Sequence, residues 1–107
     1  MIKGFLLSLF ILPLVACGGG NEVDQSELRS VISKSTDYKM HRELFENTAA
    51  QVIRVGFCSM EDFRKHAGWE RSVNAPYNYF VYCGGLDRTD RLYLNVMTGA
   101  YNFGDPA

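Results

Sequence analysis

The sequence predicts an α+β domain in which two to three helices pack on one face of a small three-stranded antiparallel sheet. Apolar residues recur at helical spacing in the first half of the expected folded region. From Tyr77 onward they alternate with polar residues, and β-branched and aromatic side chains become more frequent. With 107 residues, of which 47% are hydrophobic, the chain has the size and composition of a single folded domain.

Residues 1–16 have the layout of a signal peptide. Lys3 supplies one positive charge, and the stretch from Gly4 to Ala16 carries none. That stretch has the length of the apolar region of a signal peptide and is shorter than the ~20 residues of a membrane-spanning helix. Pro13 also argues against a continuous membrane helix.

The segment Leu14-Val15-Ala16-Cys17 resembles the lipobox of bacterial lipoproteins, in which an aliphatic and a small residue precede an obligatory cysteine. An ordinary secretory cleavage site would need a small side chain where Leu14 stands. The resemblance implies that Cys17 is lipidated, that cleavage removes residues 1–16, and that the membrane-anchored protein faces the periplasm. The alternative, a generic leader with an unrelated cysteine, predicts a soluble periplasmic protein.

Residues 17–23 are expected to comprise the lipidated cysteine and a flexible tether, because Gly18-Gly19-Gly20 has no fixed backbone preference. Gly18, in place of Asp directly after the cysteine, resembles lipoproteins that are sorted to the outer membrane. The outer membrane is therefore favoured over the inner membrane. Residues 24–107 remain as a single α+β domain.

Two helices are predicted before residue 56. Asp24-Gln25-Ser26-Glu27 has the pattern of a capping box and precedes apolar residues at helical spacing, which predicts a short first helix. Residues 37–55 follow as the main core helix with Gly56 as its stop, although Asn47-Thr48 could divide it. The apolar stripe of this helix comprises Met40, Leu44, Phe45, Ala49, Val52 and Ile53.

A third helix is predicted over about residues 60–67. Ser59 can cap it, the acids Glu61 and Asp62 favour its first turn, and Gly68 ends it. Trp69, just beyond this helix, is expected to fold back on the core as a large apolar plug.

Three strands are predicted after Tyr77, joined by a glycine-containing loop and then by a tight turn. These strands cover residues 78–83, 91–97 and 100–103. Alternation gives the middle strand an aliphatic face with Leu92, Leu94 and Val96. We expect the helices to bury this face.

Cys58 and Cys83 are expected to form a disulfide. If Cys17 is lipidated, they are the two cysteines that remain, and export places them in an oxidising compartment. A redox centre or a metal site is the alternative, but the chain has neither a Cys-x-x-Cys spacing nor a Cys/His cluster. The bond would put Cys83 on the buried sheet face, with the helix after Cys58 against it.

The uncovered face of the sheet is the predicted binding surface. Phe80, Tyr82 and Tyr93 fall on it by alternation, and Tyr101 or Phe103 could join them. Amphipathic aromatic side chains suit recognition of a protein or a glycan. Alternatively, these aromatic residues have only a structural role. Tyrosines fit the solvated side of a sheet, or the N-terminal helix could cover them.

Composition and motifs argue against several function classes. A formal charge of -1 and a pI near 6.1 give no electrostatic footprint for nucleic acid. His41 and His66 lie in charged helical segments, and the chain lacks the motifs of serine hydrolases, zinc peptidases and phosphate-binding loops. We therefore expect no catalytic site, no metal and no cofactor.

The sequence thus predicts a non-catalytic, periplasm-facing lipoprotein that serves as a small binding module for another protein or a glycan of the cell envelope. One alternative is a lysozyme inhibitor or a lipoprotein that excludes phages, by analogy with other small lipidated disulfide proteins. A second alternative is a small envelope enzyme, which would need a cleft with His41 or His66 beside an acid.

Overall fold

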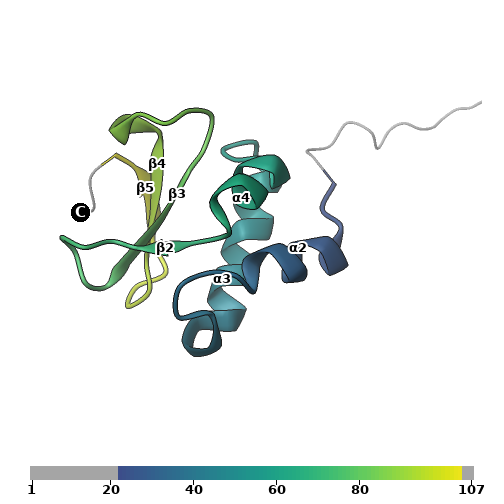
Figure 1. Ribbon diagram of the computed structural model, residues 1–107, viewed down its shortest axis with the longest axis horizontal. Coiled ribbons are helices and arrows are strands. Elements are labelled where there is room, and N and C mark those ends of the chain that lie inside the picture. Colours follow the sequence, from purple (N-terminus) through teal and green to yellow (C-terminus); the bar gives the residue numbers. More distant parts are fainter. Residues whose placement is uncertain (1–21, 105–107) are drawn as a thin grey trace, which may run out of the picture.

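The computed structural model describes residues 22–104 (Figure 1). The predicted signal peptide, the lipidation site Cys17 and most of the tether lie outside these residues. The elements in chain order are α2 (Gln25–Ile32), α3 (Tyr38–Arg54), α4 (Met60–His66), β2 (Glu70–Arg71), β3 (Asn78–Tyr82), η1 (Arg88–Asp90), β4 (Arg91–Asn95) and β5 (Tyr101–Phe103). The α+β class is confirmed, and no helix in the described range is long and apolar enough to cross a membrane.

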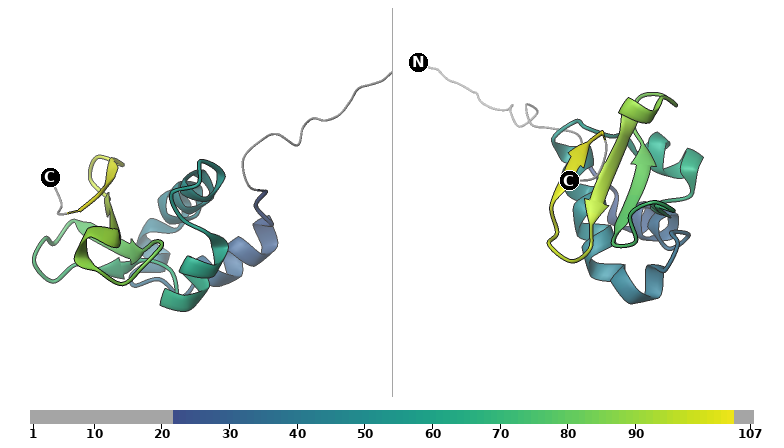
Figure 2. Two further views of the ribbon diagram at one scale, coloured as in Figure 1. Left: turned by 90° about the horizontal axis from the view of Figure 1, so that it is seen from above. Right: turned by 90° about the vertical axis from the view of Figure 1, so that its left-hand side faces the viewer.

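The strands form an antiparallel sheet in the order β2-β3-β4-β5, and the α-helices gather on one side of it (Figure 1; Figure 2). In the part of the chain that the structure describes, the sheet has four strands rather than the predicted three. The additional strand, β2, consists of Glu70 and Arg71, which pair with Phe80 and Tyr79. Two residues are too few to show an alternating pattern, so the sequence did not reveal this strand.

Helices α2 and α4 begin at the predicted caps. The Asp24 carboxylate accepts a hydrogen bond from the Glu27 N–H at 3.1 Å. Ser59 and Asp62 form a reciprocal capping box, with distances of 3.1 and 2.9 Å. Gly56, with a φ angle of 90°, follows the C-terminal end of α3 as predicted.

The first turn of α3 departs from the prediction. His41 has non-helical backbone angles (φ -128°, ψ 26°), so the helix is kinked there and not at Asn47-Thr48. Residues before the kink no longer keep the helical phase of those after it, and Met40, predicted in the core, is 74% exposed. The later members of the apolar stripe lie in or against the core: Leu44, Phe45, Ala49, Val52 and Ile53.

The core lies between the helices and the sheet face that carries Leu92 and Leu94, both of which are fully buried as predicted. Trp69 fills the space between these layers and is only 1% exposed. Its indole N–H donates to the carbonyl of Phe45 at 3.2 Å, and its backbone N–H donates to Ser35 Oγ at 2.8 Å. The expected apolar plug is therefore confirmed.

The predicted disulfide is also confirmed. Cys58 and Cys83 are bonded, their Cα atoms are 4.8 Å apart, and both residues are buried in the core. Because Cys58 lies just before α4 and Cys83 just after β3, the bond fastens the start of this helix to the end of that strand.

Candidate functional site

The aromatic face predicted as a binding surface is less exposed than expected. Phe80, Tyr82 and Tyr93 share the sheet face that points away from the helices, which lie behind the sheet in the right-hand view of Figure 2. The Phe80 ring centroid is 5.7 Å from that of Tyr82 and 5.6 Å from that of Tyr93. Phe80 is 7% exposed and Tyr93 2% exposed, whereas Tyr82 is half-buried. Most of this aromatic surface is therefore inaccessible.

Tyr101 does not belong to that face. It lies opposite Leu94 in the β4–β5 ladder, packs against the core, and has its ring centroid 6.4 Å from that of Phe57. Phe103 lies opposite Leu92 in the same ladder, and its ring centroid is 5.7 Å from that of Phe57. It is therefore on the same side of the sheet as Tyr101. The face of β5 was misassigned because a strand this short carries too few apolar positions to specify its register.

The structure instead assembles a cleft of about 410 Å³. It lies where the start of α3 meets Arg71 of β2, Tyr79 of β3 and the turns that flank the β3–β4 hairpin. The residues of these turns that line it are Pro76, Tyr77, Val96 and Met97. Segments far apart in the sequence thus meet in one concave surface.

A hydrogen-bonded cluster forms the polar part of the cleft. The Asp37 carboxylate accepts hydrogen bonds from the Tyr79 hydroxyl at 2.6 Å and from Arg71 Nε at 3.0 Å, and Arg71 Nη2 contacts the same oxygen. The bonds from Arg71 and Tyr79 hold the pKa of Asp37 below its usual 3.8. Burial, together with the bond to Asp37, raises the pKa of Tyr79. At neutral pH the ionised Asp37 and Arg71 therefore cancel each other's charge.

The backbone beside this cluster is unusual. Asp37 has left-handed angles (φ 58°, ψ 30°), which Asp tolerates better than most residues, and the kink at His41 follows within one turn. Such strain persists only where the surrounding contacts determine it. Here the contacts are the bonds from Arg71 and Tyr79 to the Asp37 carboxylate, and strained backbone of this kind is typical of functional sites.

An exposed apolar rim surrounds the polar cluster. Met40, Tyr77 and Met97 line the cleft and are 74%, 57% and 70% exposed. Gathered apolar side chains mark interaction sites, and flexible methionines adapt to the shape of a partner. Sequence reasoning missed the rim because it assigned Met40 to the core and Met97 to a strand that ends at Asn95. No local signal joins these three residues, which only the fold brings together.

His41 lines the same cleft as Asp37. The enzyme alternative requires such a histidine beside an acid in a cleft. The ring centroid of His41 is 5.4 Å from that of Tyr79. The described hydrogen bonds of the Asp37 carboxylate, however, come from Arg71 and Tyr79, so Asp37 does not orient a histidine base towards a nucleophile. Within the described range, no group of three or more His, Cys, Asp or Glu side chains could hold a metal ion.

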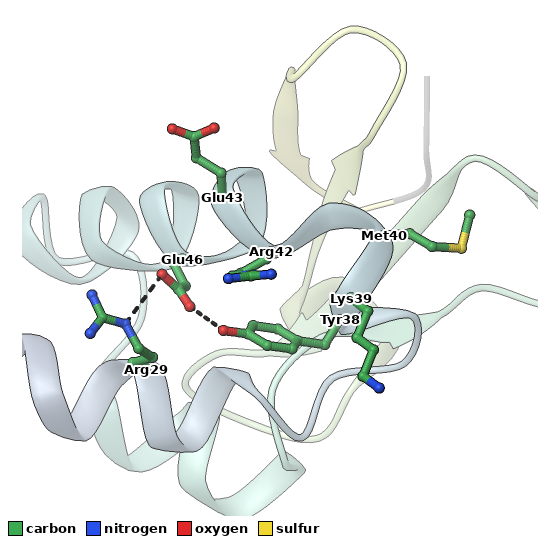
Figure 3. Close-up of a pocket in the computed structure, with 7 residues that line it drawn as sticks. All are labelled: Arg29, Tyr38, Lys39, Met40, Arg42, Glu43 and Glu46. Atoms are coloured by element: carbon green, nitrogen blue, oxygen red, sulfur yellow. Dashed lines mark hydrogen bonds and ion pairs between the residues drawn. The ribbon is translucent and has the colours of Figure 1, made fainter.

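A second hollow, of about 650 Å³, is lined by residues of α2 and of the first turns of α3 (Figure 3). The Tyr38 hydroxyl donates to Glu46, whose carboxylate also pairs with Arg29 at 3.7 Å. The bond to Glu46 raises the pKa of Tyr38. These contacts tie α3 to α2, and Met40 points away from them (Figure 3). The hollow therefore has a structural explanation.

The chain matches no protein-family model, no curated protein and no solved structure. Its function is therefore inferred from the cleft and the apolar rim.

Proposed function

We propose that the protein is a non-catalytic lipoprotein of the bacterial cell envelope that faces the periplasm and binds another envelope protein through the cleft. The observation that carries this proposal is the exposed rim of Met40, Tyr77 and Met97 around the polar cluster of Asp37, Arg71 and Tyr79.

The character of the cleft favours an apolar group of the partner over an ion. Asp37 and Arg71 neutralise each other, so this pair offers no unbalanced charge to a ligand. The rim is apolar and open, and burying one large apolar side chain against it would contribute roughly 1.5–3 kcal/mol to binding. A protein that inserts such a side chain matches these properties.

The short length of the tether favours a partner that lies at the membrane. If Cys17 is lipidated, residues 18–23 separate the lipid from Asp24, the cap of the first helix. The chain from Cys17 to Asp24 spans at most ~25 Å when fully extended. The domain would then remain close to the bilayer and meet proteins of the envelope surface.

Site-specific photo-crosslinking in native membranes tests the proposal. A photoreactive side chain at position 77 should give one discrete protein adduct. The same probe at Leu86, which is 72% exposed at the opposite end of the β3–β4 hairpin, should not give it. The double variant Met40→Ser/Met97→Ser should lose the adduct and keep normal expression and membrane attachment.

Two results would contradict the proposal. The same adducts from positions 77 and 86 would show that contact is not specific to the cleft, and an adduct that persists in the double variant would exclude the methionines as its basis. Mass spectrometry of the adduct identifies the partner, and a glycan or lipid in place of a protein would reject the proposed partner class.

A further inference from the structure

Arg91 lies over the aromatic face of the sheet. Its guanidinium carbon is 4.4 Å from the ring centroid of Phe80 and 5.2 Å from that of Tyr82. Its Nε donates to the Tyr82 hydroxyl at 2.9 Å, and its Nη1 donates to the Tyr93 hydroxyl at 3.0 Å. Two rings and two hydroxyls therefore hold the guanidinium in a defined position.

The charge of Arg91 differs in its surroundings from that of three other arginines. Arg29, Arg64 and Arg71 each pair with a carboxylate. Within residues 22–104, the hydrogen-bond partners of the Arg91 guanidinium are the hydroxyl groups of Tyr82 and Tyr93 rather than carboxylates. The guanidinium is thus a cation without a carboxylate partner in this range.

Glu70 lies on the same face but does not supply the missing charge. It is opposite Phe80 in the β2–β3 ladder, whereas Arg91 is opposite Tyr82 in the β3–β4 ladder, and no ion pair joins the two in the described range. The bonds to Tyr93 and Tyr82 raise the pKa of Arg91, so its charge persists. The remaining N–H groups on Nη1 and Nη2 can bond to an acceptor outside the fold.

We propose that Arg91 and Tyr82 form a binding site for an oxyanion, a carboxylate or a phosphate group, carried by an envelope component. The planar fork of Nη1 and Nη2 matches two oxygens of such a group. Tyr82 is half-buried, and its ring centroid lies 5.3 Å from that of His66. Its hydroxyl accepts from Nε of the same guanidinium, which places it next to the two Nη groups. The site and the cleft use different residues, so each can be tested without the other.

The test uses the mature, lipidated protein in a nonionic detergent. Sodium phosphate and sodium acetate are titrated separately at an ionic strength held constant with chloride, and the NMR resonance of the Arg91 Nε–H is followed. We expect a saturable shift with at least one of these two anions and no saturable shift with chloride. The two titrations distinguish a phosphate site from a carboxylate site.

Variants assign the shift to this site, with the Tyr82 ring resonances followed where Arg91 is replaced. Arg91→Gln should weaken binding about tenfold, because charge-assisted hydrogen bonds are lost, and Tyr82→Phe should weaken it less. Arg64→Gln is the matched control, since Arg64 is already paired with Glu27 and Glu61, and it should bind as the wild type does.

Equal responses to phosphate, acetate and chloride would overturn the proposal, as would wild-type affinity in Arg91→Gln. If Arg91→Gln does not fold, Arg91→Lys takes its place. Lysine keeps the charge but loses the planar fork, so it should still bind more weakly than arginine, and wild-type affinity in this variant would also overturn the site.

Discussion

The Tyr79 hydroxyl donates a hydrogen bond of 2.6 Å to the carboxylate of Asp37, which lies 42 residues earlier in the chain. This bond joins the left-handed residue before α3 to strand β3, and Arg71 of β2 donates to the same oxygen. A single carboxylate thus connects the helical layer to two strands of the sheet at the cleft.

The stability of the fold should depend on pH through Asp37. Hydrogen bonds from Arg71 and Tyr79 lower the pKa of this carboxyl in the folded state below 3.8. A carboxyl with a lowered folded pKa stabilises the fold above its unfolded pKa, and this contribution is lost as the pH falls through the folded pKa. The melting temperature of Asp37→Asn should therefore lie below that of the wild type at about pH 6 and converge with it as the pH falls through the folded pKa of Asp37.

Glu43→Gln is the control for this measurement, because Glu43 is exposed and lies outside the polar cluster. The difference in melting temperature between this variant and the wild type should change much less over the same pH range. If the melting temperature of Asp37→Asn differs from that of the wild type by the same amount at every pH, the proposed role of the carboxylate is contradicted.

Loss of the disulfide between Cys58 and Cys83 should destabilise the domain strongly. The two cysteines are separated by 25 positions in the sequence, and the chain-entropy model gives about 3.5 kcal/mol for a loop of this length. The variant Cys58→Ala/Cys83→Ala should have a free energy of unfolding in urea that is lower by about this amount. A reductant should bring the wild type towards the variant and leave the variant unchanged. A variant as stable as the oxidised wild type would refute this expectation.

Helix caps and strand alternation could be predicted because their signals are local. The atoms that cap α4 belong to Ser59 and Asp62, three positions apart, so the sequence alone places them together. Alternation likewise predicts which side chains of β4 share a face, and Leu92 and Leu94 are both buried.

The cleft could not be predicted in this way. Asp37, Arg71 and Tyr79 meet only because the two-residue strand β2 pairs with β3 and the chain turns sharply before α3. Similarly, alternation placed Phe80 on the face away from the helices, but it did not indicate that the guanidinium of Arg91 stacks on this ring. Such side-chain contacts depend on tertiary structure, which periodicity does not describe.

Gly68 and Gly56 offer a matched test of packing around Trp69. Both have positive φ angles, 83° and 90°. A Cβ atom at position 68 would lie 2.2 Å from Ser35 Oγ, the acceptor of the Trp69 N–H, whereas one at position 56 would meet nothing within 4 Å. Gly56→Ala should cost about 1–2 kcal/mol from backbone strain, and Gly68→Ala should cost about 1–3 kcal/mol more from crowding. Equal free energies of unfolding in urea for the two variants would contradict the crowding.

Replacement of Cys17 tests the membrane anchor on which the proposed location depends. The resemblance of the segment before it to a lipobox implies acylation of its thiol, and each CH₂ group buried in the bilayer contributes about 0.8 kcal/mol to anchoring. Metabolic labelling with a radioactive fatty acid should mark the wild type and the variant Cys58→Ala/Cys83→Ala, but not Cys17→Ser. Because serine cannot accept the thioether-linked lipid, the label distinguishes the first cysteine from the two in the disulfide. Label that persists in Cys17→Ser, or a wild type that carries none, would remove the basis for an envelope partner held at the membrane surface.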